Sequence, residues 1–212
     1  MFTTGFTMSV QNVAENWPGE SVSYLQDLSD KFDTAIICSI VIRDKSNYFN
    51  RLVFIKPNSD IQYYDKRHLF TMGEEHKYYS AGQKRVVVEY KSWRFMPLVC
   101  YDLRFPVWSR NDLEYDALIY VANWPDSRKD VLKTLLKARA LENQAYVFGV
   151  NRVGKDEMGL NYAGNTLAFD AKGNGLVDTE EYQESLLIVE VDKESLMQFL
   201  TKFKVLEDID DF

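Results

Sequence analysis

The stretch at 117–144, ALIYVANWPDSRKDVLKTLLKARALENQ, decides the fold class because a buried strand runs directly into an amphipathic helix. Residues 117–123 form a short apolar run that is typical of a strand covered on both faces. The Trp-Pro pair at 124–125 ends this strand, since a residue before proline is steered away from helical angles. Beyond Ser127, a candidate N-cap, apolar residues recur at three- and four-residue spacing, which predicts a helix to the end of the stretch.

The same alternation of strands and helices continues on both sides of this stretch. No repeat or flexible linker interrupts it, so we expect a single domain over residues 1–212. Helices would lie outside and sheet inside, which is an α/β layered fold. Further strands are predicted at 34–43, 50–56, 61–64, 85–90, 93–100, 146–150, 167–170 and 186–191, and a last helix at about 195–203.

Composition narrows the classes of partner. The chain carries 25 Lys and Arg against 32 Asp and Glu, a formal net charge of −7. Such a surface has no general attraction for phosphates or anionic lipid, so we expect neither nucleic acid nor a membrane as a partner. Two cysteines are too few for a disulfide framework, and this favours the cytoplasm. The common zinc and phosphate-binding motifs are missing from the sequence, so neither a common zinc site nor ATP binding by a Walker loop has support.

The residues 98–106, LVCYDLRFP, carry the sharpest chemical signal. Cys100 lies where a buried strand gives way to a polar turn, and backbone N–H groups that converge there favour a thiolate and can hold an oxyanion. Cys100 is therefore a candidate nucleophile, with a small buried hydrophobic residue as the alternative. Cys38 lies in the middle of a predicted strand, and its position favours the structural interpretation.

Lys66 and the pair Glu74-Glu75 could complete a site around that thiol. Lys66 follows a predicted strand, where a fixed ammonium would lower the pKa of the thiol and stabilise an oxyanion. The alternatives are a solvated surface lysine and an exposed acidic loop. Local sequence leaves both interpretations open.

Three segments in order give a family resemblance. YDKRHLF at 64–70, VCYDLRFP at 99–106 and ARALENQ at 138–144 closely resemble the signatures of the nitrilase superfamily. Within this superfamily, the residues of these motifs are most similar to those of bacterial omega-amidases of the YafV type. The resemblance covers essentially the whole chain. It implies a four-layer αββα sandwich that forms a homodimer and hydrolyses carbon–nitrogen bonds with a Glu-Lys-Cys triad, without metal or organic cofactor.

The resemblance also implies roles for individual residues. Cys100 resembles the nucleophile, which attacks an amide carbonyl and forms a thioester. Lys66 resembles the triad lysine, which would hold the oxyanion together with the N–H of Tyr101. Glu75 resembles an additional glutamate that orients the lysine and the substrate.

For an omega-amidase, the implied substrates are terminal amides of short 2-oxo dicarboxylates, such as 2-oxoglutaramate. The candidate substrate-binding residues are Asn123, Trp124, Arg104 and Arg139, of which the two arginines match motif positions that are more often structural. Other amidases or carbamoylases of the superfamily remain alternatives.

The start of the chain departs from the family pattern. The family's general-base glutamate lies in a segment resembling LPEMFTTGF, and this chain opens at Met1 with MFTTGF. We therefore expect a longer native enzyme that supplies this glutamate together with the family's first strand, first helix and second strand. The alternative is a catalytically inactive dimeric scaffold that lacks the base.

Overall fold

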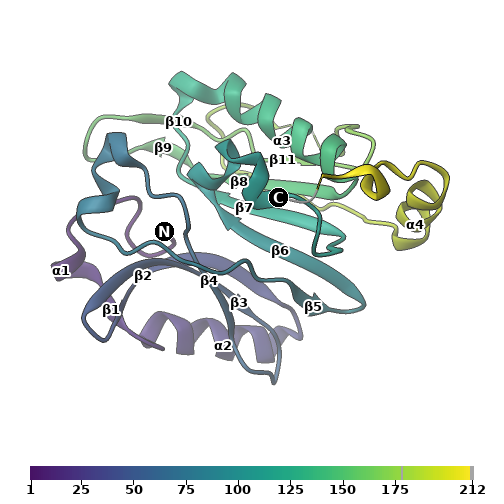
Figure 1. The fold of residues 1–212 in the computed structure, drawn as a ribbon. Helices are drawn as coiled ribbons and strands as arrows, with labels where there is room; N and C mark the ends of the chain where they lie inside the picture. Colours follow the sequence, from purple (N-terminus) through teal and green to yellow (C-terminus); the bar gives the residue numbers. More distant parts are fainter. Residues whose placement is uncertain (178, 211–212) are drawn as a thin grey trace.

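Two β-sheets packed face to face form the centre of the fold (Figure 1), seen in a computed structural model that describes residues 1–177 and 179–210. The first sheet has the order β1-β2-β3-β4. Its long hairpin pairs Ile36 with Ile55 at one end and Asp44 with Asn47 at the turn. The strands are β1 (Glu15–Asn16), β2 (Ile36–Asp44), β3 (Asn47–Ile55) and β4 (Gln62–Asp65).

The second sheet has the order β11-β8-β7-β6-β5. Its three central strands, β6, β7 and β8, are parallel, and β5 and β11 pair antiparallel at the edges. The strands are β5 (Val88–Tyr90), β6 (Trp93–Val99), β7 (Ala117–Ala122), β8 (Tyr146–Asn151) and β11 (Leu167–Phe169). A separate ribbon joins β9 (Val153–Lys155) to β10 (Asn161–Ala163).

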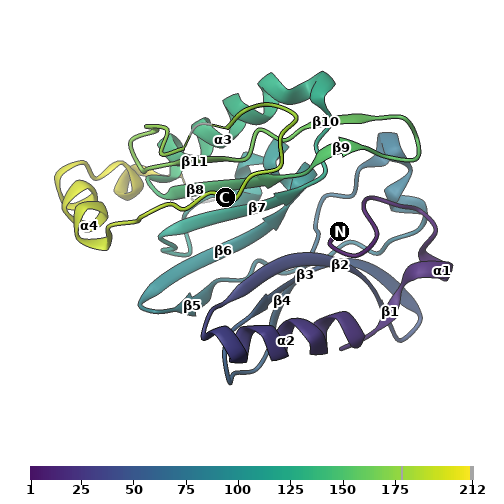
Figure 2. The same cartoon turned by 180° about the vertical axis from the view of Figure 1, so that it is seen from behind.

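Helices cover the outer face of each sheet. α2 (Glu20–Phe32) lies under the first sheet and α3 (Lys129–Asn143) lies over the second, while α4 (Lys193–Lys202) lies at one end of the second sheet (Figure 2). The short α1 (Val10–Val13) precedes β1. The resulting order of layers, helix, sheet, sheet and helix, confirms the predicted αββα sandwich.

Two apolar clusters hold the layers together. The inner face of α2 presents Val22 and Leu25 to Ile40 and Val53 of the first sheet. The larger cluster joins both sheets to α3, because buried side chains of β3, β4, β6, β7 and β8 meet Leu132 and Leu136 of that helix. These contacts remove apolar surface from water, which is the main favourable term in folding.

The structure corrects some of the predicted elements. Residues 186–191 form no strand, and the side chains of Leu186 and Ile188 are 91% and 84% exposed. The apolar run at 186–189 is typical of a strand, but no neighbouring strand among the described residues pairs with it. The helix α2 was not predicted, although Val22, Leu25 and Leu28 form an apolar stripe along it. The helix predicted from Ser127 begins at Lys129, after a short 3-10 turn.

No helix among the described residues is both long enough and apolar enough to cross a membrane.

We expect Gly82→Ala to destabilise the end of β4. An added Cβ at this glycine would lie 1.9 Å from the carbonyl oxygen of Asp65, while the Gly82 N–H donates to the Lys66 carbonyl at 2.9 Å. The backbone must shift, and overpacking of this kind costs about 3 kcal/mol of unfolding free energy. Urea denaturation measures it. The control Gly175→Ala, where nothing lies within 4 Å of the added Cβ, should stay within about 0.5 kcal/mol of wild type. Equal losses in both variants would contradict this account.

Candidate active site

A cleft of about 700 Å³, counting space open to solvent, lies at the carboxyl ends of the parallel strands β6 and β7. Cys100 directly follows β6, and Asn123 directly follows β7. Because these strands are parallel neighbours, the loops that begin at these two residues lie together. Ligands of α/β proteins bind at this end of parallel strands. Of the residues predicted for the site, the cleft is lined by Lys66, Cys100, Tyr101, Arg104, Asn123 and Trp124.

The backbone turns sharply at Cys100. Its φ of 46° lies in the left-handed region, which a residue with a Cβ rarely adopts. Strain of this kind persists where the surrounding structure enforces it, and it is common at functional sites. The Cys100 thiol donates to the Asn123 carbonyl oxygen, with the sulfur 3.8 Å away. The turn therefore directs the sulfur toward the loop that follows β7.

Opposing influences act on the Cys100 thiol. Burial raises the pKa of Cys100 above its ordinary value, the nearby Lys66 ammonium lowers it, and the Glu75 carboxylate raises it again. Burial is the largest of these effects, so the pKa of the thiol lies above its ordinary value. A proton must therefore leave the sulfur when it reacts.

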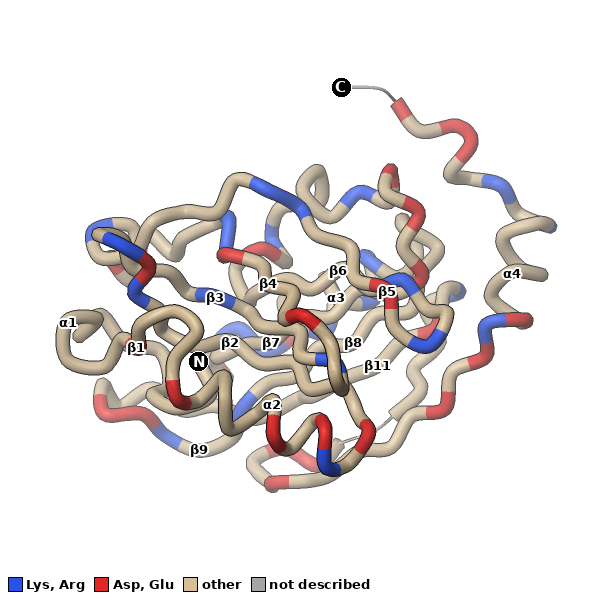
Figure 3. The backbone as a smooth tube through the Cα atoms, turned by 90° about the horizontal axis from the view of Figure 1, so that it is seen from below, with Lys and Arg blue, Asp and Glu red and all other residues tan. Residues whose placement is uncertain are grey.

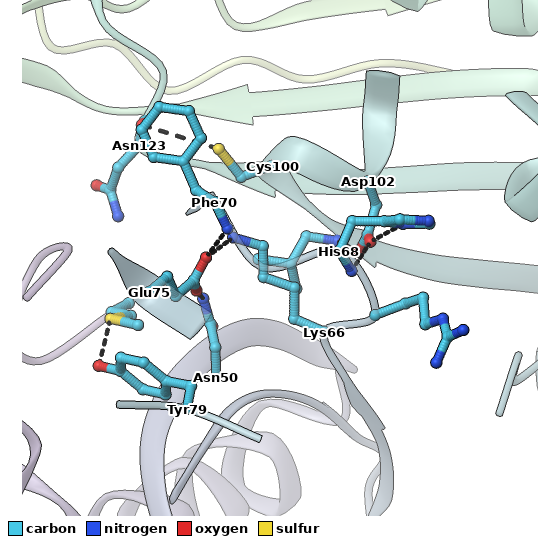
Figure 4. Close-up of polar contacts among 12 residues, drawn as sticks. Asn50, Lys66, His68, Phe70, Glu75, Tyr79, Cys100, Asp102 and Asn123 are labelled. Carbon is cyan, nitrogen blue, oxygen red and sulfur yellow. Dashed lines mark hydrogen bonds and ion pairs between the residues drawn. The ribbon is translucent and has the colours of Figure 1, made fainter. Parts of the chain in front are cut away.

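Lys66 and Glu75 form a buried ion pair beside the cleft (Figure 4). Lys66 Nζ lies 2.5 Å from Glu75 Oε2, and the two side chains are 2% and 0% exposed. Glu75 also accepts from Asn50 Nδ2 at 3.1 Å and from the Phe70 N–H at 2.6 Å. With three donors, the carboxylate is fully engaged and fixes the direction in which Lys66 points.

The two adjacent glutamates have opposite environments. Glu74 has a left-handed φ of 59° and is exposed, where it pairs with Lys77 at 2.5 Å. This backbone turn sends Glu75 inward. Glu75 is thus buried against Lys66, whereas the exposed-loop interpretation fits Glu74.

Asp102 connects the turn that carries Cys100 to the segment that carries Lys66. It accepts from Tyr64 Oη at 2.9 Å, from the His68 N–H at 2.9 Å and from the Val99 N–H at 3.0 Å. The His68 ring also contacts Asp102, through Nδ1 at 2.8 Å (Figure 4). One buried carboxylate therefore holds both sides of the cleft in register.

Asn151, at the end of β8, fixes the position of Trp124. Its side-chain oxygen accepts from the Trp124 N–H at 2.8 Å, and its Nδ2 donates to the Trp124 carbonyl at 2.9 Å. The indole N–H of Trp124 donates to the Arg128 carbonyl at 2.8 Å. Trp124 is thus a rigid wall of the cleft.

Three arginines have different positions. Arg104 lines the cleft, with Cζ 5.3 Å from the ring centroid of Trp124. Arg139 is buried in α3, where it donates to the Leu103 carbonyl at 2.6 Å and pairs with Glu142 at 2.7 Å, and it does not line the cleft. Its position fits the structural interpretation. Arg128, which was not predicted, lines the cleft as well.

Sequence reasoning missed Asn50, Phe70, Asn151 and Arg128. The first three act through a strand amide or a backbone N–H, and such contacts leave no local pattern. Arg128 does leave a signal, because it is a cation at the N-cap of a helix, where the helix dipole disfavours positive charge.

No cluster of three or more His, Cys, Asp and Glu side chains suited to a metal occurs among the described residues. The groups that the cleft offers are a thiol, an ammonium held by a carboxylate, and two guanidinium groups.

Comparison with known proteins identifies the family. The family model described as carbon-nitrogen hydrolase matches residues 1–199. The chain belongs to the carbon-nitrogen hydrolase family. An omega-amidase, YafV of Yersinia enterocolitica, is 46% identical over 214 residues, which cover 100% of this chain and 82% of the relative. A 2-oxoglutaramate amidase of Bacillus subtilis (strain 168) is 31% identical and is also matched over 82% of its length.

A solved carbon-nitrogen hydrolase has the same fold. XC1258 of Xanthomonas campestris superposes with a TM-score of 0.96 at 40% identity, over 100% of this chain and 82% of that protein, and its active site carries an arsenic adduct. These findings confirm the predicted resemblance to the nitrilase superfamily and the predicted fold class. The protein is a hydrolase that acts on carbon–nitrogen bonds.

The buried ion pair leads to a test of stability. Lys66→Met leaves the Glu75 carboxylate buried without its cation, and breaking a buried pair on one side costs about 3–5 kcal/mol. The double variant Lys66→Met with Glu75→Gln removes both charges and should recover most of this loss. Urea denaturation of both variants measures the difference. A double variant as unstable as Lys66→Met would show that the ion pair is not the cause.

The raised pKa leads to a test of thiol reactivity. We expect iodoacetamide to alkylate Cys100 before Cys38, because burial raises the pKa of Cys38 to about 12, whereas the Lys66 ammonium opposes the effect of burial at Cys100. The Cys100 rate should still be rising at pH 9, since a thiol with a raised pKa gains thiolate throughout this range. Mass spectrometry of the variants Cys38→Ser and Cys100→Ser separates the two rates. A Cys100 rate that levels off below pH 8 would contradict the raised pKa.

Proposed function

We propose that this protein is a cysteine-dependent amidase that releases ammonia from the terminal amide of a short 2-oxo dicarboxylate, such as 2-oxoglutaramate. The observation that carries the proposal is that one cleft contains the Cys100 thiol, the Lys66 ammonium and the Arg104 guanidinium. The omega-amidase and 2-oxoglutaramate amidase relatives support this substrate class.

The reaction proceeds in two halves. The Cys100 sulfur forms a bond to the amide carbonyl carbon, the carbon–nitrogen bond breaks, and the thiol proton leaves with the nitrogen as ammonia. A thioester remains. Water then attacks the same carbon, the carbon–sulfur bond breaks, and one proton of the water returns to the sulfur.

Lys66 and the Tyr101 N–H stabilise the charge that develops on the carbonyl oxygen. Donors fixed before the reaction stabilise an oxyanion without reorganising, and this is commonly a large part of catalysis. Glu75 holds the Lys66 ammonium at 2.5 Å, so the buried lysine stays oriented toward the cleft. Glu75 therefore acts by positioning Lys66.

The rest of the cleft recognises the substrate. The half-buried Asn123 and the buried Trp124 form the wall beside the sulfur. Arg104 lies over the Trp124 ring and supplies positive charge for the substrate carboxylate. Arginine suits this task because its planar fork matches a carboxylate.

We further propose that the enzyme acts in the cytoplasm as a homodimer. The two cysteines are both free, which fits a reducing compartment. The homodimer rests on the resemblance to the nitrilase superfamily.

Ammonia release from 2-oxoglutaramate by the protein as the cell makes it tests the proposal. Cys100→Ala should lose activity by about a thousandfold or more, because the nucleophile is removed. Cys38→Ala is the matched control and should retain activity. Rapid acid quenching followed by mass spectrometry should show the acyl group on the peptide that contains Cys100.

Two outcomes would count against this function. Ammonia release that survives Cys100→Ala would exclude the thioester route. A folded wild-type protein that hydrolyses other amides but not 2-oxoglutaramate would place it with other amidases of the family.

A further inference from the structure

We propose that Arg128 is a specificity-determining residue that binds the carboxylate of the substrate, so that the cleft selects anionic over neutral amides. This inference rests on the proposed amidase function and assigns a further residue to that site.

The Arg128 side chain contacts the ring of Phe70 but pairs with no carboxylate among the described residues. Within residues 1–177 and 179–210, its guanidinium has no hydrogen-bond or ion-pair partner. The adjacent Lys129 points instead to Glu181, at 2.5 Å. Lys129 is thus paired with a carboxylate at the surface, whereas the neighbouring Arg128 lines the cleft.

The position of Arg128 is unfavourable for the helix that it precedes. It is the N-cap of α3 and makes no side-chain capping bond. Asn, Asp and Ser are preferred at this position, where the positive end of the helix dipole repels a cation. A residue that costs stability where it lies calls for another explanation, and contact with an anion supplies one.

Aromatic contacts fix Arg128 beside the reacting groups. Its Cζ lies 5.5 Å from the ring centroid of Phe70, whose N–H donates to Glu75. The edge of the Tyr101 ring packs on the same Phe70 ring, with centroids 5.1 Å apart. The guanidinium therefore stacks on a side chain that also contacts the residue following Cys100.

The charge around the cleft suits an anion. No Asp or Glu is among the described residues that line it, whereas Arg104 and Arg128 both are. The whole chain has a formal charge of −7, and acidic side chains recur along α2 and in the segment after α4 (Figure 3). Two guanidinium groups, from the loops after β6 and β7, make the cleft locally positive in an acidic protein.

Arg128→Asn tests the role because it removes the cation and supplies a preferred N-cap. With 2-oxoglutaramate, we expect KM to rise at least tenfold while kcat changes less than threefold. With pentanamide, a neutral amide of the same chain length, kcat/KM should stay within twofold of wild type. The melting temperature should be equal or higher, which separates lost binding from lost folding.

Two further variants serve as controls. Arg128→Lys keeps the positive charge but loses the planar guanidinium that can donate two hydrogen bonds to a carboxylate. Its KM for 2-oxoglutaramate should therefore lie between those of wild type and Arg128→Asn. Arg152→Gln removes a cation that stacks on Tyr162 at 4.8 Å but already donates to the Val153 carbonyl at 3.3 Å. Arg152→Gln should leave KM for 2-oxoglutaramate within twofold of wild type. A rise in KM as large as that of Arg128→Asn would show that the general positive potential, and not Arg128 itself, binds the carboxylate.

A readout without turnover separates this inference from the proposed function. The product 2-oxoglutarate should protect Cys100 of the wild type from iodoacetamide, and Arg128→Asn should need at least tenfold more of it. Wild type that releases no ammonia but shows this difference would overturn the proposed substrate and keep the carboxylate site. Equal protection in both proteins, no protection of the wild type, or equal loss of activity on both amides would overturn the role of Arg128.

Discussion

The buried ion pair between Lys66 and Glu75 is the constraint on which the candidate site depends. Charges withdrawn from water must find partners, and Glu75 meets this requirement with three donors, one from β3 and two from the loop after β4. The loop after β4, which carries both Lys66 and Glu75, is tied to β3 through Asn50 and is braced internally by the Phe70 N–H. Removing one partner would leave an uncompensated charge, so the pair keeps the Lys66 ammonium in a single direction.

The thiol is held by the same arrangement from the other side. Cys100 lies in a left-handed turn, and Asp102, two residues later, ties that turn to Tyr64 and His68 on the Lys66 side. Burial keeps the pKa of the thiol raised, while Lys66 opposes this effect. The site therefore places the Cys100 thiol close to a cation whose direction is fixed.

The cleft is assembled at the ends of the parallel strands. The ends of parallel strands bring together loops that lie far apart in sequence, and these loops carry both the sulfur and the two guanidinium groups. Loop residues can change without disturbing the sheets that support them, which lets one fold serve several amides. Membership of the carbon-nitrogen hydrolase family accordingly fixes the type of bond, and in our proposal the arginines select the substrate.

The sequence by itself determined the alternation of strands and helices, the strand ends at Lys66 and Cys100, and the family. These features are local, because burial periodicity and motif spacing are written along the chain. Only the tertiary structure shows that Glu75 is buried while Glu74 is exposed, and that Arg128 lines the cleft while Arg139 does not. It also shows that residues 186–191 have no strand partner among the described residues. The local sequence around a charged residue does not distinguish a solvated side chain from one that is paired with another charge or that faces a ligand. An extended segment likewise becomes a strand only when another backbone lies beside it.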